Sequence, residues 1–339
     1  MSAEPRTDVA AGIEAPEARD VSSGERAGEL ANRYGLLVLF VVVAVLFSAL
    51  KPDTFPTLDN AQTIASTQAV VALLALAATL PLIVGQFDVS IGFQLGLSQT
   101  LCAGLQIKNG WPAFPTAAAG VVSCLAIGAV NGLLVTKLRL NSFIATLGVG
   151  TVVLGLTQLY GNDETISGQL PHSFMSLGQN QALDIPLPFV YVAVVAILMW
   201  LAMEYTAWGR ECHATGGNPR AALLAGVRTE RVTLQCFVLA GLLSGISGVL
   251  SVTILGGAAP TVGLGALLPA YAAAFLGATA FRPGRFNSAG TMLAIYLLAT
   301  GVTGLQSLGA QFYVEQLFYG GSLLIALAAS ALVERRRGA

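Results

Sequence analysis

The sequence is poor in charged residues. Only 10% of its 339 residues are Asp, Glu, Lys or Arg, against roughly 25% in a typical soluble domain. So few charges cannot cover a surface that faces water, and 55% of the residues are hydrophobic. The net charge of -1 produces no basic field that would attract nucleic acid, so no nucleic-acid partner is expected. The composition predicts a protein whose surface faces the lipid bilayer.

The signatures of common catalytic and metal sites are also missing. None of the three lysines belongs to a GxxxxGK[ST] phosphate-binding loop, which excludes ATP hydrolysis by that route. The chain has no HExxH or GxSxG motif, and its four cysteines form no CxxC pair. We therefore expect no catalytic residue, no metal site and no cofactor, and we interpret the cysteines of the apolar stretches as small core residues.

Long apolar runs are what the sequence has in abundance. A helix that crosses a bilayer needs about 20 mostly apolar residues. We predict an all-α, polytopic membrane helix bundle of about ten spans, with nine and eleven as alternatives. The ten are 34–50, 62–84, 89–106, 113–136, 142–160, 187–203, 232–255, 265–281, 287–306 and 315–333. Residues 1–30 are polar and are predicted to form a disordered cytoplasmic tail, so the membrane domain covers residues 31–335.

Basic residues fall almost entirely on alternate connections. Fifteen of the 17 Lys and Arg residues lie in the N-terminal tail, 137–141, 204–231, 282–286 and 334–339, and the other two are Lys51 and Lys108. Positively charged connections stay on the cytoplasmic side of a membrane. The pattern thus predicts that both termini and the connection 204–231 are cytoplasmic.

A polar segment, Gly85–Gly92, interrupts the apolar pattern after Pro81. Its acid, Asp88, lies at the edge of an apolar span, where a carboxylate is costly and needs a reason. Asp88 could line the path of a transported solute, or it could accept hydrogen bonds from the first amides of a helix that starts near Val89. The two roles are compatible.

The connection 204–231 contains a short helix with both ends marked, within residues 216–226. Asn218 is a favourable N-cap, Pro219 suits the first helical position, and Gly226 suits the left-handed conformation after the last turn. A helix this short is marginal in water by itself, so it needs a docking surface on the bundle or on a partner. Four arginines surround it, and ordinary cytoplasmic charge explains any one of them.

Six separated segments, taken together and in order, carry a resemblance. They are Gly85–Gly92 (GQFDVSIG), Asn131–Val135 (NGLLV), Phe143–Gly148 (FIATLG), Gly209–Val227, Ala240–Gly245 (AGLLSG) and Gly277–Thr279 (GAT). From about residue 34 to 333 the chain resembles the inner-membrane permease subunits of ribose-type sugar ABC importers. It departs from them at Gln86, where a glycine is usual, and at His213, where a tyrosine is usual.

The resemblance implies a permease subunit that moves a monosaccharide, such as a pentose, by alternating access. It implies contact with an ATP-binding cassette subunit through Gly216, Gly217, Asn218, Pro219, Arg220, Ala221 and Gly226. It implies a substrate pathway at Gln86, Asp88, Ser90 and Thr146. The other implied partners are an extracytoplasmic sugar-binding protein and a second permease copy. The alternative is an ion-coupled secondary transporter that works without an ATPase, with Asp88 as the acid that titrates.

Overall fold

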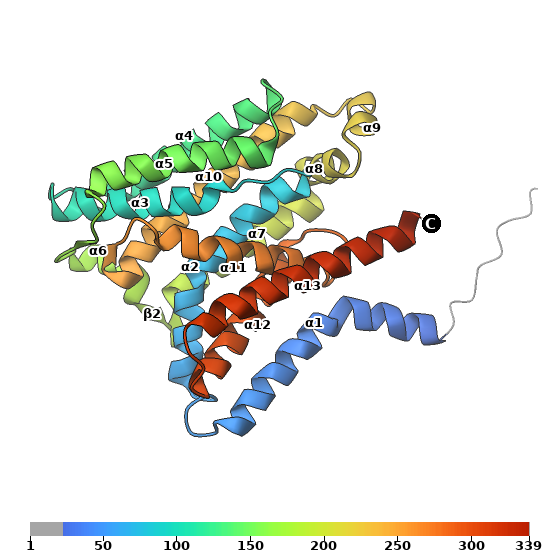
Figure 1. The fold of residues 1–339 in the computed structure, drawn as a ribbon, viewed down its shortest axis with the longest axis horizontal. Coiled ribbons are helices and arrows are strands. Elements are labelled where there is room, and N and C mark those ends of the chain that lie inside the picture. Colours follow the sequence, from blue (N-terminus) through green and yellow to red (C-terminus); the bar gives the residue numbers. More distant parts are fainter. Residues whose placement is uncertain (1–22, 339) are drawn as a thin grey trace, which may run out of the picture.

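The computed structural model describes residues 23–338, with side chains described for residues 33–328. This part of the chain is a bundle of helices joined by short connections and four two-residue strands (Figure 1). The helices are α1 (Ser23–Leu50), α2 (Leu58–Ile83), α3 (Ser90–Ile107), α4 (Ala113–Thr136), α5 (Ser142–Gly161), α6 (His172–Gln179), α7 (Leu187–Tyr205), α8 (Ala207–Gly217), α9 (Pro219–Leu224), α10 (Thr229–Leu255), α11 (Val262–Gly277), α12 (Ser288–Ser307) and α13 (Tyr313–Gly338). The strands are β1 (Ile166–Ser167), β2 (Gln181–Ala182), β3 (Ile185–Pro186) and β4 (Gly257–Ala258).

Each predicted span coincides with a helix of the structure. Within the described residues, seven helices are long and apolar enough to cross a membrane: α1, α2, α4, α5, α7, α10 and α12. Helix α11 has only 16 residues, and α3 carries three glutamines along its 18 residues. The helical membrane bundle is thereby confirmed.

One helix boundary and one additional helix differ from the prediction. Helix α1 begins at Ser23, so the last part of the predicted tail of residues 1–30 is helical, and residues 1–22 lie outside the described residues. Residues 207–217 form α8, which precedes the short helix that the caps predicted. Because α8 carries Arg210, Glu211 and His213, its sequence shows no long apolar run that would predict a helix.

The centre of the bundle is formed by close packing of α10 on α4, α2 and α3. Small residues allow this approach. A Cβ at Gly128 of α4 would overlap the Phe237 carbonyl oxygen of α10, and a Cβ at Gly241 of α10 would overlap the Cys124 carbonyl oxygen of α4. The three cysteines of the apolar stretches are buried, as expected of small core residues, and Cys212 of α8 is buried as well.

The bundle has two distinct ends, with α8 and α9 at one and α6 and β2 at the other (Figure 1). At the α8–α9 end, Lys137 and Glu230 form an ion pair of 2.8 Å, and Arg282 pairs with Glu204. At the α6 end, β1 pairs with β4 and β2 pairs with β3, both antiparallel. At the first end, each ion pair thus links a connection to the end of a helix, and at the second end short strands pair the connections with one another.

Candidate functional site

The chain breaks between α2 and α3 in a segment that we call the break segment, residues 84–89. Three of its amides donate to side chains of distant helices instead of to a helical ladder. They are Phe87 N to Ser142 Oγ (3.1 Å), Asp88 N to the Tyr271 hydroxyl (3.1 Å) and Val89 N to Thr146 Oγ1 (3.0 Å). Helices α5 and α11 therefore hold the break segment by accepting from one buried amide, that of Asp88, and from two part-buried amides.

A buried polar network centres on the Asp88 carboxylate. Its Oδ1 accepts from the Ser90 amide (3.0 Å), the Ser90 hydroxyl (2.6 Å) and Asn131 Nδ2 (3.3 Å). The Ser90 oxygen in turn accepts from Gln94 Nε2 and Asn131 Nδ2, both at 2.7 Å. The four side chains have 0% exposure. Charge-assisted bonds of this kind are the strong ones, so the network fixes the break segment against α3 and α4.

The predicted pathway residues are brought together at this site, though not around an open channel. Asp88, Ser90 and Thr146 are fully buried, and Gln86 is partly exposed. The capping role expected of Asp88 is present in modified form: the formal N-cap of α3 is Val89, and Asp88 bonds the first helical amide, that of Ser90. Sequence reasoning missed Tyr271, which contacts Asp88 across 183 positions of sequence and has no local signal.

The predicted capped helix is confirmed as α9. Asn218 Oδ1 accepts from the Ala221 amide at 3.0 Å, and Pro219 is the first helical residue. At the other end the Gly226 and Val227 amides donate, both at 3.0 Å, to the carbonyls of Leu223 and Ala222. With Gly226 at φ +86°, this is a Schellman motif. Gly216 and Gly217 belong to the end of α8.

Helix α9 presents leucines to solvent. Leu223 is 61% exposed and Leu224 is 89% exposed, whereas Ala222 is buried on the opposite side at 5%. Arg220 and Ala221 are also exposed. This helix lies outside the seven helices that could cross a membrane. An apolar, capped turn of helix in a basic connection is a surface that a protein partner can cover.

Helix α8 connects α9 to the break segment through a glycine contact. A Cβ at Gly216 would overlap the carbonyl oxygen of Ile83, the last residue of α2, while a Cβ at Gly217 would meet nothing within 4 Å. Trp208 Nε1 donates to Gln235 Oε1 at 3.0 Å and ties α8 to α10. Burial, together with the nearby Arg285 and Arg282, lowers the pKa of His213 on α8, although Glu204 opposes this. His213 is thus kept neutral near pH 7.

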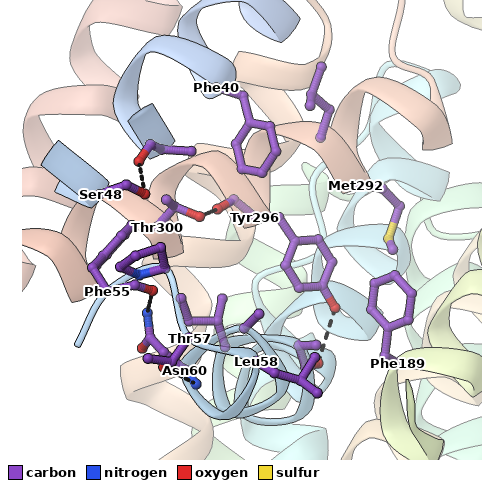
Figure 2. A pocket seen from close by; sticks show the side chains of 16 residues that line it. Phe40, Ser48, Phe55, Thr57, Leu58, Asn60, Phe189, Met292, Tyr296 and Thr300 are labelled. Carbon is purple, nitrogen blue, oxygen red and sulfur yellow. Dashed lines mark hydrogen bonds between the residues drawn. The ribbon is translucent and has the colours of Figure 1, made fainter. Parts of the chain in front are cut away.

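A large cavity of about 810 Å³ lies between α1, α2 and α12, with Phe189 of α7 in its wall (Figure 2). Phe40, Phe55 and Met292 are among its apolar lining residues. The Tyr296 hydroxyl donates to the Ala65 carbonyl, and Asn60 Nδ2 donates to the Phe55 carbonyl. Ser48 and Thr300 also donate to backbone carbonyls. Because its donors are already used within the protein, this cavity offers little to a hydroxyl-rich solute.

Comparison with known proteins places the chain among membrane permeases. It is 32% identical over 306 residues to the ribose import permease protein of Bacillus subtilis, which covers 90% of this chain and 92% of that protein. It is 28% identical to the D-allose transport system permease protein of Escherichia coli, over 90% of this chain and 93% of that protein. It is also 28% identical to the L-arabinose ABC transporter permease protein of Azospirillum brasilense, over 92% of each chain. No solved structure matches the chain.

The family model described as "Branched-chain amino acid transport system / permease component" matches residues 60–327, which include the break segment, α9 and every helix from α3 to α12. With most of the chain matched by this model, and with relatives similar along nearly their full length, the chain belongs to this family of transport-system permease components.

Proposed function

We propose that the chain is the permease subunit of an ATP-driven sugar importer of the cell membrane, with ten spans and both termini in the cytoplasm. The names of its relatives support sugar as the substrate class. The sidedness is supported by Arg210 of α8 and Arg220 of α9, and by Lys137 and Arg282, whose ion-pair partners Glu230 and Glu204 flank the connection that contains α8 and α9. The α8–α9 end would face the cytoplasm, because positively charged connections are retained there.

The single observation that carries this function is α9. A six-residue helix, capped at both ends and with Leu224 89% exposed, is preformed for a partner and lies where a cytoplasmic ATPase can reach it. Gly216, Gly217, Asn218, Pro219, Arg220, Ala221 and Gly226 would form the coupling surface. The chain would not be an enzyme itself, since ATP would be hydrolysed in that separate subunit.

The substrate would cross next to the break segment. Gln86, Asp88, Ser90 and Thr146 would line the path in a conformation that separates α5 and α11 from residues 84–89. Because the amides of the break segment bond side chains of α5 and α11, a shift of either helix would move the segment. The complete importer would contain a second permease copy and an extracytoplasmic sugar-binding protein, and its mechanism would be alternating access.

The test replaces Leu224 with glutamate and measures co-purification of the ATPase subunit and the ATPase activity stimulated by the sugar-binding protein. The expected result is loss of both, because a charge would be placed at the centre of the docking surface. A second variant, Arg220→Glu with Ala221→Glu, tests the same surface through charge. The control is Leu183→Glu, which alters a 96% exposed leucine in the turn between β2 and β3 at the opposite end. It is read by co-purification of the ATPase alone, because the sugar-binding protein would dock at that end.

Normal co-purification and stimulation by the Leu224→Glu protein would contradict the coupling role. Sugar uptake by the chain alone in liposomes, without any ATPase, would instead support the ion-coupled alternative. In that case Asp88→Asn should abolish uptake, because the titrating carboxylate would be gone.

A further inference from the structure

Two adjoining cavities lie at the α6 end of the bundle, opposite the proposed coupling surface. The outer cavity has a volume of about 410 Å³ and lies between α2 and residues 178–181, which include the end of α6. The inner cavity has a volume of about 240 Å³ and lies between α2, α10, α11 and α13. Thr67 and Ile254 belong to the walls of both. The two cavities therefore adjoin and lead from the surface into the bundle.

The outer cavity is lined by one polar face of α2. Asp59, Gln62, Thr63, Ser66 and Thr67 follow a spacing of three and four residues, which places them on the same side of the helix. The facing wall adds the side chains of Gln179, Asn180 and Gln181. Just beyond this face, residues 69–78 of α2 are all apolar and buried apart from partly buried Val71. The polar face is thus confined to the part of α2 that meets the cavities.

The inner cavity contains polar groups that the bundle does not fully use. Gln68 Oε1 is buried and has no hydrogen-bond partner among the described residues. Ser251 of α10 is 1% exposed, Tyr319 of α13 is 3% exposed, and Glu315 of α13 completes the polar part of the wall. An unsatisfied polar group is expensive inside a membrane protein. The side-chain donors of the cavity of Figure 2 are bonded to backbone carbonyls, and so are those of Gln62, Thr63 and Thr67 in the outer cavity. The unpaired Gln68 oxygen is therefore what sets the inner cavity apart.

The lining also defines the chemistry of a ligand. Among the residues whose side chains the structure describes, no Lys, Arg or His lines either cavity, while Asp59 and Glu315 supply carboxylates and the glutamines supply amide oxygens. These groups accept hydrogen bonds from hydroxyls and repel anions. The inner cavity is smaller than the roughly 300–1,000 Å³ of sites for drug-sized ligands, which favours a solute of one ring.

We infer that these two cavities form the external substrate site of the permease, in which Gln68, Glu315 and Tyr319 bind a neutral, hydroxyl-rich solute that enters along α2. The inference rests on the proposed function, because it takes the α6 end as extracytoplasmic. It assigns substrate contacts to the end of the bundle opposite Asp88. The break segment and the cavities would then be the inner and outer parts of one route.

The experiment uses Gln68→Cys in the complete complex with its ATPase and sugar-binding protein. The four native cysteines are buried, so a membrane-impermeant methanethiosulfonate added from outside reports mainly on position 68. Two quantities are measured for D-ribose, D-allose and L-arabinose in the same preparation. The first is uptake of the sugar, and the second is its effect on the rate at which position 68 is labelled. The expected result is labelling that an imported sugar slows at least threefold. Ser251→Cys provides a second position in the inner cavity should Gln68→Cys fail to assemble.

The matched control is Gln311→Cys, which changes an exposed glutamine near the start of α13 that lines neither cavity. Its labelling should not respond to sugar. The inference is overturned if position 68 is unreactive, if an imported sugar leaves its labelling unchanged, or if Gln311→Cys is protected equally. Absence of uptake of all three sugars by the unmodified complex would instead contradict the proposed function. The uptake assay detects that failure separately from the labelling assay.

Discussion

Replacement of Gly216 by alanine probes the contact between α8, the helix that precedes α9, and the end of α2. Gly216 and Gly217 are the last two residues of α8, and neither has a positive φ. Alanine in a helix is favoured over glycine by about 1 kcal/mol, so each substitution gains up to that amount. Only the Gly216 Cβ would overlap a neighbour, the Ile83 carbonyl oxygen, which is backbone and cannot rotate away. Overpacking of this kind costs about 1–3 kcal/mol.

The two variants should therefore diverge. Gly217→Ala should be neutral or slightly stabilising, while Gly216→Ala should be destabilised or should displace α8 from the end of α2. The measurements are unfolding in mixed detergent micelles, co-purification with the ATPase, and sugar uptake per ATP hydrolysed. We expect Gly216→Ala to retain the ATPase but to lose at least half of its uptake per ATP. Equal behaviour of the two alanine variants in all three measurements would refute a role for the Gly216–Ile83 contact.

Three further predictions concern the same end of the molecule. Tyr271→Phe leaves the buried Asp88 amide without its acceptor and should cost about 1–3 kcal/mol of stability. Chemical denaturation measures this loss, and the control Tyr313→Phe, at an exposed tyrosine, should leave the stability unchanged. Asn218→Ala removes the N-cap of α9 and should destabilise that helix by about 1 kcal/mol. The expected result is weaker co-purification of the ATPase, and Asn218→Asp should restore the co-purification because aspartate also caps a helix. Burial lowers the pKa of His213 in the folded state, so the unfolded chain binds the proton more readily and stability should fall as the pH drops through about 6.5. His213→Gln should flatten the stability profile between about pH 7.5 and 5.5, and an unchanged slope would contradict the assignment.

Local signals in the sequence predicted a large part of the structure correctly. The ten apolar segments all lie on helices, because each helix satisfies its own backbone hydrogen bonds and needs only a sufficient apolar length. The caps of α9 were readable for the same reason: Asn218 bonds an amide three residues later, and Gly226 lies two residues after the last helical residue. The polar residues of Gly85–Gly92 likewise located the break between α2 and α3.

The partners of those segments depend on the tertiary structure alone. Asp88 meets Tyr271, Gly216 meets Ile83, and Gln68 lines a cavity with Glu315, and each pairing joins segments far apart in the chain. Helix α8 escaped prediction because it has no long apolar run. Apolar length and capping chemistry act within a few residues, so the sequence by itself determined which segments are helical and where α9 begins and ends. Packing decides which side chains face one another, so only the folded bundle determined the buried network, the glycine contact and the two polar cavities.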